Sequence, residues 1–297
     1  MHRAASYLVS CATPAPSLGE LLQQGSFRPV PRTLTLTTDF GTQDAYVAAM
    51  KGVILERCPG APLVDVTHEI APQDVMEAAF VLRQAVPYFP DQAVHLVVVD
   101  PGVGTERRPV ALRAGDHFFV GPDNGLFSLV LGEDAPDEIA VLDDPERWRT
   151  PDPSTTFHGR DIFAPAAAHL AAGGTLSGLG SRAEELQPLR WALPITDDQG
   201  IQGWTVHIDR FGNCITNVPQ GLFEEHANGR TAKCYAGSAI LEGLAPTYGA
   251  VAEGEPLLVF GSSGFLEVAV SGGNAAKLLG IQKGDSVDVV FQSADGA

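Results

Sequence analysis

The sequence predicts an α/β fold: an open α/β domain over residues 31–185 with a mostly parallel sheet, then a smaller domain of antiparallel strands over residues 201–297. Two observations predict it. In the first part, strand patterns alternate with helix patterns, which is typical of a layered parallel sheet. In the second part, short strand patterns are separated by glycine, proline and asparagine turns, which favours a small sandwich or barrel. The polar residues 181–200 are the expected linker.

The first strand and the first helix follow from residues 33–54. Residues 33–38 (TLTLTT) are rich in β-formers, and Asp39 ends this predicted strand. Asp44 stands where a helix N-cap is expected. The helix that follows presents apolar side chains at helical spacing: Val47, Met50, Val53 and Ile54.

The next elements continue the alternation. Residues 63–68 (LVDVTH) are expected to form the second strand, and residues 72–89 a second helix with Pro72 near its start. Residues 93–99 form the third strand, whose apolar run indicates burial on both faces, as in a parallel sheet. This order of strands and helices predicts an open α/β layer.

Shorter signals fill the rest of the chain. Strands are expected near 110–113 and 118–121, a turn at 123–125 (DNG), and an alanine-rich helix over 162–172. Beyond the linker no helix of comparable strength is expected. The strands predicted there are residues 204–208, 257–260, 266–270 and 287–291.

The charge balance is acidic, with 36 Asp and Glu residues against 19 Lys and Arg residues, a formal net charge of −17. This disfavours nucleic acid and anionic membranes as partners, because both require a basic surface. The acidic surplus fits a cationic ligand or, more simply, a solvated acidic face. No apolar run is long enough to span a membrane.

The four cysteines are scattered and form no C-x-x-C pair, which argues against a zinc site or a redox motif: Cys11, Cys58, Cys214 and Cys234. Unpaired thiols in a chain of this size indicate a reducing compartment, so a cytoplasmic location is expected. Residues 1–30 are poorly patterned and too weakly apolar for a secretory signal. They are expected to form a disordered or loosely docked extension.

Polar side chains follow all three strands of the predicted parallel sheet. Asp39 ends the first strand, His68 and Glu69 end the second, and Asp100 ends the third. Ligands of open α/β sheets bind outside the carboxyl ends of the strands, so these side chains are expected at one edge. There Asp39 can accept hydrogen bonds from both hydroxyls of a ribose, and a plain turn aspartate is the alternative.

Residues 100–107 (DPGVGTER) form a glycine-bearing loop directly after the third strand. Its glycines let the backbone approach a ligand closely. The loop lacks the Gly-Lys-Ser/Thr ending of a phosphate-binding P-loop. The structural alternative is a tight loop that is closed by an Asp–Arg salt bridge.

His158 and Asp161 precede the alanine-rich helix. A lone histidine in this place is either structural or catalytic, and Asp161 is the expected N-cap. Aspartate, histidine and arginine would also suit a metal hydrolase. However, no His-x-x-x-His pair or other tight ligand spacing is present, so no metal site is expected.

Two segments of the second domain also stand after predicted strands. Residues 209–213 (DRFGN) and 261–267 (GSSGFLE) are β-turns when each is read alone. Phe211 is nevertheless able to stack on an adenine ring, and Asn213 to pair with its edge.

Seven motifs in order resemble one family, the S-adenosylmethionine hydroxide adenosyltransferases (S-adenosylmethionine hydrolases), to which the fluorinase and chlorinase are related. The resemblance covers about residues 35–290 and leaves out the amino-terminal extension. The motifs are residues 38–41 (TDFG), 64–68 (VDVTH), 100–108 (DPGVGTERR), 121–126 (GPDNGL), 156–161 (TFHGRD), 209–213 (DRFGN) and 261–264 (GSSG).

The resemblance implies an α/β domain joined to a β-barrel-like domain. It also implies a homotrimer whose ligand lies between one subunit's first domain and a neighbour's second. The ribose-binding carboxylate maps onto Asp39. Contacts to the methionine part map onto Asp44, Asp209 and Ser262, and the adenine site maps onto Phe211, Asn213, Asn274 and Ala275.

The resemblance also distinguishes two branches of the family, one that uses water or hydroxide as the nucleophile and one that uses a halide. The hydroxide-using branch carries an Asp, Arg, His triad that matches Asp100, Arg107 and His158. The halogenase branch has a tyrosine at the first position, no histidine, and an insertion that is absent here. Gly159 occupies the halide-contacting position but decides nothing, because glycine also occurs in a chlorinase-like site.

The implied activity is hydrolysis of S-adenosyl-L-methionine to adenosine and L-methionine, with S-adenosyl-L-methionine as substrate and no cofactor. The alternatives are a chlorinase-like halogenase and a non-catalytic protein that binds S-adenosylmethionine or adenosine. Neither a nucleic acid nor a membrane is an expected partner.

Overall fold

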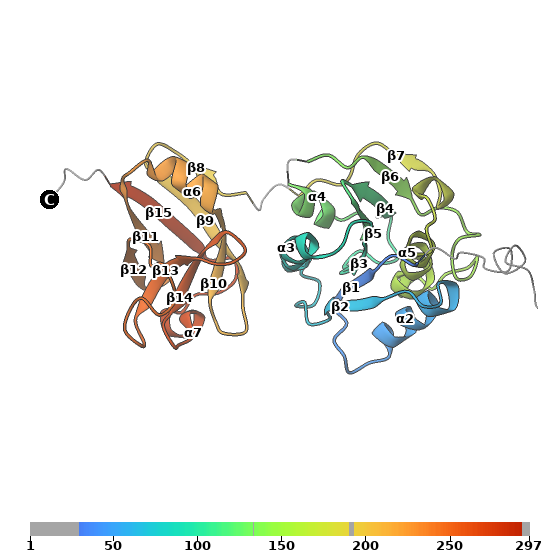
Figure 1. The fold of residues 1–297 in the computed structure, drawn as a ribbon, viewed down its shortest axis with the longest axis horizontal. Helices are drawn as coiled ribbons and strands as arrows, with labels where there is room; N and C mark the ends of the chain where they lie inside the picture. Colours follow the sequence, from blue (N-terminus) through green and yellow to red (C-terminus); the bar gives the residue numbers. More distant parts are fainter. Residues whose placement is uncertain (1–29, 133, 190–192, 293–297) are drawn as a thin grey trace, which may run out of the picture. The chain divides into compact units, whose positions relative to one another are not determined.

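The computed structural model describes residues 30–132, 134–189 and 193–292, and two sheets dominate this part of the chain (Figure 1). The first has seven strands in the order β2-β1-β3-β5-β4-β6-β7. From β2 to β5 the strands are parallel, and β4, β6 and β7 continue the sheet antiparallel. Its strands are β1 (Leu34–Thr38), β2 (Leu63–Thr67), β3 (Val94–Val98), β4 (Pro109–Ala114), β5 (His117–Pro122), β6 (Glu138–Val141) and β7 (Arg182–Ala183).

Helices cover both faces of this sheet (Figure 1). The helices are α2 (Tyr46–Arg57), α3 (Val75–Ala85), η1 (Val86–Tyr88), α4 (Leu126–Leu131), η2 (Gly159–Phe163), α5 (Ala164–Ala171) and η3 (Leu176–Gly178). The pleat of β3 explains why two cores form. Leu96 packs with α2 and α5 in one core, while its neighbour Val97 packs with α3 and α4 in the other. The prediction of an α/β sheet buried on both faces is confirmed.

Two helix starts differ from the sequence-based expectation. The helix α2 begins at Tyr46 with Ala45 as N-cap, so Asp44 does not cap it. The helix α3 begins at Val75, because the carboxylate of Asp74 accepts a hydrogen bond from Glu77 N at 2.9 Å and so forms the cap. Pro72 therefore lies before the helix.

The second sheet is antiparallel throughout and forms a nearly closed barrel in the order β12-β11-β15-β9-β10-β14-β13, with β8 paired to β9. This decides the open choice between sandwich and barrel. Its strands are β8 (Ile195–Thr196), β9 (Gly200–Ile208), β10 (Cys214–Pro219), β11 (Thr231–Ala236), β12 (Ala239–Glu242), β13 (Pro256–Phe260), β14 (Phe265–Val270) and β15 (Ser286–Gln292). Two short helices, α6 (Gln220–Ala227) and α7 (Ala275–Leu279), accompany it.

The expected linker is partly structured, since β7 and β8 stand within residues 181–200 and pair with the two sheets.

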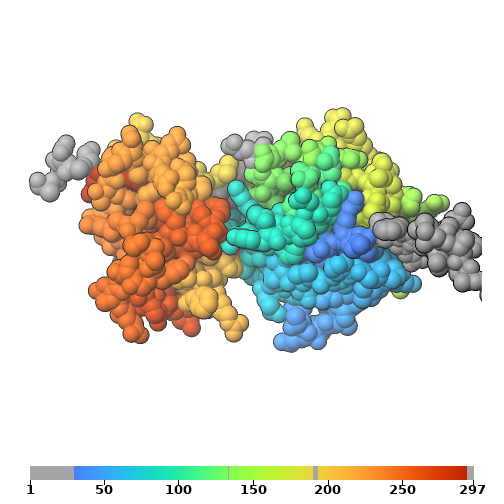
Figure 2. Space-filling model, viewed as in Figure 1, coloured from blue at the N-terminus to red at the C-terminus, as the bar shows by residue number. Residues whose placement is uncertain are grey.

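The helix α3 and the barrel are joined by Lys283, whose Nζ lies 2.5 Å from Asp74 Oδ2 and 3.0 Å from Glu77 Oε2. Figure 2 shows the surface that the described residues present on one face.

The proposed extension over residues 1–30 falls almost entirely outside the described residues, and the domain limits stay a prediction. Within the described ranges, no helix has both the length and the apolarity to cross a bilayer.

Candidate active site

The loop between β3 and β4 is closed by an ion pair. Arg107 Nε donates to Asp100 Oδ1 at 2.9 Å, and Nη2 of the same guanidinium pairs with Oδ2. The two side chains are only 9 % and 6 % exposed. A two-pronged, charge-assisted pair in such a place fixes the direction of both groups. The structural alternative for this loop, a salt bridge, is therefore present, and the same pair belongs to the predicted triad.

His158, which follows Arg107 by 51 residues in the chain, contacts this ion pair. Its Nδ1 lies 2.8 Å from Arg107 Nη2. A guanidinium only donates, so Nδ1 accepts, and the neutral ring carries its proton on Nε2. Burial lowers the pKa of His158, the charge of Arg107 lowers it further, and the carboxylates of Asp100 and Asp161 act against this. The three residues predicted as a triad thus form one cluster, with His158 in its neutral form.

One donor of this cluster has no hydrogen-bond partner among the described residues. Arg107 Nη1 is buried, and no hydrogen bond satisfies it within the part of the chain that the structure describes. A buried guanidinium N–H without an acceptor is costly unless a ligand or water occupies the place. Because Nη1 belongs to the group that holds Asp100 and His158, an oxygen bound there would lie within the cluster.

A glycine brings the Asp100 loop against the His158 loop. Gly104 has φ +75°, and a β-carbon at this position would stand 2.4 Å from the carbonyl oxygen of Thr155. Both the left-handed backbone and the close approach require glycine. The contact holds the two loops at the separation at which Arg107 reaches His158.

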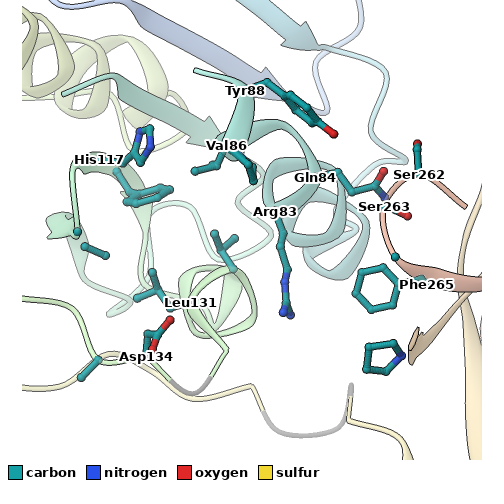
Figure 3. A pocket seen from close by; sticks show the side chains of 18 residues that line it. Arg83, Gln84, Val86, Tyr88, His117, Leu131, Asp134, Ser262, Ser263 and Phe265 are labelled. Atoms are coloured by element: carbon teal, nitrogen blue, oxygen red, sulfur yellow. The ribbon is translucent and has the colours of Figure 1, made fainter. Parts of the chain in front are cut away.

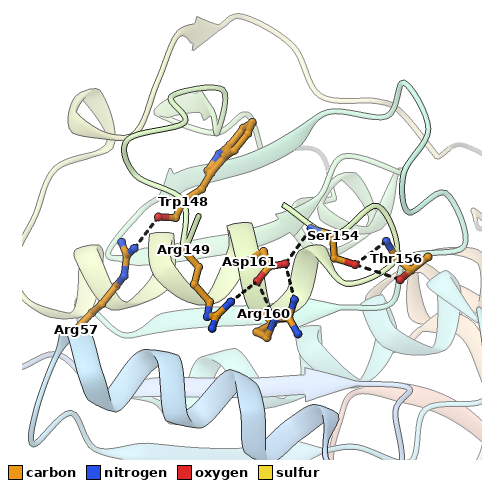
Figure 4. A network of polar contacts seen from close by, with 7 residues as sticks. All are labelled: Arg57, Trp148, Arg149, Ser154, Thr156, Arg160 and Asp161. Carbon is orange, nitrogen blue, oxygen red and sulfur yellow. Dashed lines mark hydrogen bonds and ion pairs between the residues drawn. The ribbon is translucent and has the colours of Figure 1, made fainter. Parts of the chain in front are cut away.

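Asp161 ties down the loop that carries His158 (Figure 4). It is fully buried and accepts hydrogen bonds from Ser154 N at 3.0 Å and from Arg160 Nε and Nη2 at 2.7 Å each. Arg149 Nη1 adds an ion pair at 3.6 Å. The expectation that Asp161 caps the next helix is wrong, because the π-helical turn η2 starts at Gly159 with His158 at the cap. Asp161 fastens the preceding loop instead.

Asp39 lies at the end of β1, beside an aromatic cluster. Its Oδ2 accepts a hydrogen bond from Gln73 N at 2.8 Å. The ring centroids of Phe40, Tyr46 and Phe157 are 5.2 to 5.9 Å apart, which joins the Asp39 loop to the His158 loop. The sequence-based site omitted these three rings, although Phe40 and Phe157 are direct neighbours of predicted site residues. Asp44 is exposed on the connection to α2.

The predicted residues of the barrel form a second group around the turn after β9. Asp209 Oδ1 accepts from the backbone N–H of Phe211 and of Asn213 at 2.9 Å each, and Oδ2 accepts from Asn213 Nδ2 at 3.0 Å. This confirms a turn and leaves the ring of Phe211 75 % exposed. Gly212 has φ +89°, and its Cβ would stand 2.1 Å from the Asn274 carboxamide, so the two residues are in close contact.

The neighbouring positions differ in what they offer to a ligand. Asn274 caps α7 by accepting from Lys277 N at 2.8 Å. Ala275 is completely buried in the barrel core and exposes no surface in this chain. Its place in an adenine site stays a prediction.

Ser262 lines a cavity of about 870 Å³ (Figure 3). None of the triad residues Asp100, Arg107 and His158 lines it. Arg83, Tyr88 and His117 of the α/β domain face the same cavity. Between the α/β group around Asp100 and the barrel group around Asp209, no hydrogen bond or ion pair occurs over residues 30–132, 134–189 and 193–292. The structure therefore brings the predicted residues together as two groups.

Comparisons with known proteins cover both parts of the chain. Residues 34–180 match the family model of the SAM hydroxide adenosyltransferase N-terminal domain, and residues 203–288 match that of the C-terminal domain. A relative from Thermus thermophilus named (R)-S-adenosyl-L-methionine hydrolase is 43 % identical over 85 % of this chain and 97 % of its own. A fluorinase from an Actinoplanes species is 28 % identical over 86 % of this chain and 96 % of its own.

A solved structure supports the same relationship. An uncharacterized conserved protein from Thermotoga maritima has a TM-score of 0.81 and 37 % identity, over 87 % of this chain and all of that chain. Together the two family models match residues 34–180 and 203–288, which make up most of the described chain. The chain belongs to the S-adenosylmethionine hydroxide adenosyltransferase family.

Proposed function

We propose that this protein is an enzyme that hydrolyses S-adenosyl-L-methionine to adenosine and L-methionine. The observation that carries the proposal is the cluster of Asp100, Arg107 and the half-buried His158, with Arg107 Nη1 unsatisfied among the described residues. Relatives that are 34 to 43 % identical are named (R)-S-adenosyl-L-methionine hydrolase. The reaction needs a water molecule that is bound, aligned and deprotonated. In this cluster Arg107 can bind and align the water, and Asp100 can accept its proton.

In the proposed mechanism, Arg107 Nη1 binds the attacking water through its oxygen. As the oxygen attacks the ribose C5′ carbon, the water loses a proton to Asp100, because Nε2 of the neutral His158 ring already carries a proton and Nδ1 accepts from Arg107. The guanidinium stabilises the developing hydroxide. The C5′–S bond breaks with its electron pair going to sulfur, so methionine leaves as a neutral thioether and no general acid is required.

The remaining predicted residues bind the substrate in this proposal. Asp39 accepts hydrogen bonds from the ribose hydroxyls. Asp44, Asp209 and Ser262 hold the methionine part, and Phe211, Asn213, Asn274 and Ala275 form the adenine site. The exposed ring of Phe211 supports this, because an apolar face of that size is stabilised by stacking on a ligand base.

A homotrimer completes the proposal, with each ligand between the first domain of one subunit and the second domain of a neighbour. The separation of the candidate residues into two groups supports it, since a site between subunits joins residues that do not touch within one chain. Light scattering on the protein as it elutes from a size-exclusion column tests the trimer, with an expected mass three times the 31.3 kDa of the chain. A monomer with full activity would contradict a site shared between subunits.

The proposal includes no cofactor and no metal ion, because the sulfonium of the substrate already makes methionine a good leaving group. It also includes a cytoplasmic location. The free cysteines Cys58, Cys214 and Cys234 support a reducing compartment.

A halogenase is the alternative within the same chemistry. A halide would have to shed its hydration next to the Asp100 carboxylate, and the repulsion between two anions is large in a poorly hydrated pocket. The fluorinase relative is also more distant than the hydrolase relative. These observations favour water as the nucleophile.

One experiment separates hydrolase, halogenase and non-catalytic binder. Purified protein is incubated with S-adenosyl-L-methionine, with and without chloride or fluoride, and the nucleoside product is identified by mass. We expect adenosine under all conditions. Arg107→Met should lower kcat/KM by about 10²-fold or more, the usual loss for a donor that stabilises developing negative charge.

The exposed neighbour Glu106 provides the matched control. Glu106→Gln should keep the wild-type rate. A 5′-halo-5′-deoxyadenosine product, or unchanged bound substrate, would exclude hydrolysis, and full turnover by Arg107→Met would exclude the proposed cluster.

A further inference from the structure

A buried histidine stands at the end of β2, and the mechanism above does not use it. His68 is 5 % exposed, and its Nδ1 lies 2.9 Å from Thr38 Oγ1. Thr38 is the last residue of β1, is fully buried, and directly precedes Asp39. Two buried polar side chains therefore meet beside the carboxylate that is proposed to bind ribose.

The other side of the ring faces a fixed carboxylate. His68 Nε2 lies 3.1 Å from Asp65 Oδ1, and Lys51 Nζ lies 2.6 Å from Asp65 Oδ2. The contact to Asp65 lacks hydrogen-bond geometry, so the carboxylate orients the ring by electrostatic attraction to its Nε2–H. Burial raises the pKa of Asp65, but its contacts with Lys51 and His68 outweigh this and lower it.

These contacts set the direction of the hydrogen bonds. An ionised Asp65 favours the tautomer of His68 with the proton on Nε2, which leaves Nδ1 as an acceptor. The hydroxyl of Thr38 then donates to Nδ1. The same Thr38 Oγ1 accepts a hydrogen bond from Phe40 N at 3.3 Å. Thr38 is thus fixed on one side by His68 and in turn fixes the backbone just after Asp39.

The segment around Asp39 is held at further points by the residues that follow β2. Gly41 N donates to the carbonyl oxygen of His68 at 2.7 Å, and Gln73 N donates to Asp39 Oδ2 at 2.8 Å. In the part of the chain that the structure describes, Asp39 Oδ1 receives no hydrogen bond. The carboxylate is therefore oriented by one oxygen and leaves the other for a ligand.

We propose that His68 is a positioning residue for ribose recognition: by fixing Thr38 and the turn after it, His68 holds the Asp39 carboxylate in the direction that the ribose hydroxyls require. This inference rests on the proposed function, in which Asp39 binds the ribose. Its physical basis is that a buried polar network specifies direction, whereas apolar residues in the same place would supply packing alone.

The test compares two substrates that differ at the ribose alone. The kcat/KM values for S-adenosyl-L-methionine and for its 2′-deoxyribose analogue are measured for each variant. In the wild type, loss of a hydroxyl that binds a carboxylate should lower kcat/KM by on the order of 10-fold or more. In His68→Leu this preference should fall to about 3-fold or less, because a misdirected Asp39 no longer makes the hydrogen bond that favours the hydroxyl.

Two further variants separate positioning from general stability. His68→Asn places a carboxamide oxygen near the Nδ1 position and should restore most of the preference. His95→Leu is the matched control, because buried His95 also pairs with a buried threonine, Thr35 Oγ1 at 2.9 Å, away from Asp39. This control should lower the melting temperature but keep the wild-type preference for the 2′-hydroxyl.

The outcomes are distinct. If the wild-type protein forms no adenosine, the proposed function fails. If it does, and His68→Leu keeps the full preference, or His95→Leu loses as much, the positioning role is overturned. Binding of adenosine and 2′-deoxyadenosine, measured by calorimetry, gives the same comparison without turnover, so a poorly active His68→Leu protein still supports or contradicts the inference.

Discussion

Arg107 determines the protonation of His158 because it donates a hydrogen bond to Nδ1 of that ring. Its guanidinium pairs with Asp100 through two nitrogens and with His158 Nδ1 through one of these. A protonated His158 would have no acceptor at Nδ1 and would face a positive charge. The neutral ring is therefore favoured at physiological pH, and the lowered pKa of His158 agrees with this.

This arrangement predicts a pH effect. In the wild type, His158 should titrate below about 6.5, the ordinary value for histidine, so an acidic limb of kcat/KM that belongs to it lies below that pH. In Arg107→Met the repelling charge is gone and the Asp100 carboxylate is left beside the ring, so the pKa of His158 should rise. NMR titration of the ring measures both values without requiring turnover.

Arg108 offers the matched control, because it pairs with Asp123 instead. Arg108→Met should leave the titration of His158 unchanged. A His158 pKa that falls in Arg107→Met would contradict the assignment of Nδ1 as an acceptor from Arg107.

Among the elements, the loops after β3 and before η2 matter more than the strands themselves. Gly104 allows the first loop to touch Thr155 of the second, and Asp161 fastens the second loop to Ser154 and Arg160. The triad depends on both, because Arg107 and His158 lie on different loops. A displacement of about 1 Å at reacting groups can lower a rate by about 10²-fold.

Gly104→Ala should therefore reduce activity strongly. The new methyl group would meet the carbonyl of Thr155, and the left-handed backbone adds about 1–2 kcal/mol of strain. We expect kcat/KM for hydrolysis to fall by on the order of 10²-fold. The control is Gly115→Ala, because Gly115 has φ +55° with open space around its Cβ position. It should incur the same backbone strain without the clash and keep its activity; equal activity of both variants would show that the loop contact is unimportant.

For the whole molecule, one charged cluster links helix α3 to the barrel. Glu77 is paired with His207 at 3.4 Å and with Lys283 at 3.0 Å, and Lys283 also pairs with Asp74. The hydrogen bond from His207 is the largest effect on Glu77, burial opposes it, and Lys283 adds to it, which together lower the pKa of Glu77 to about 2. The cluster therefore stabilises the folded protein only while Glu77 is ionised.

The sign of the pH dependence follows from that pKa. A carboxylate with a lowered folded-state pKa contributes its full stability above the unfolded value of about 4.3 and loses it as the pH falls toward 2. Glu77→Gln should lower the free energy of unfolding at pH 7 by about 1–2 kcal/mol. The difference from wild type should shrink as the pH falls from about 4.5 to about 3, measured by urea unfolding. Exposed Glu69 forms no ion pair among the described residues, so Glu69→Gln is the control; a difference that grows on acidification would refute this role of Glu77.

Much of the fold follows from local patterns. The apolar run of β3 predicts a strand buried on both faces, and Val47, Met50, Val53 and Ile54 are buried on α2 as their spacing predicts. The strands β10, β11 and β12 are absent from the sequence-based expectation. Strand preference depends on neighbours across the sheet more than on the residues themselves, and this limits prediction of short barrel strands.

The sequence by itself determined the family, the order of the main α/β elements and the residue types of the candidate triad, because these depend on local spacing and ordered motifs. Only the tertiary structure decided that His158 accepts from Arg107, that Asp161 fastens a loop, and that His68 meets Thr38 beside Asp39. The partners Arg107 and His158 are 51 residues apart, and Thr38 and His68 are 30 apart. Hydrogen-bond direction between such distant residues is set by how the strands and loops pack, which local residue patterns do not encode.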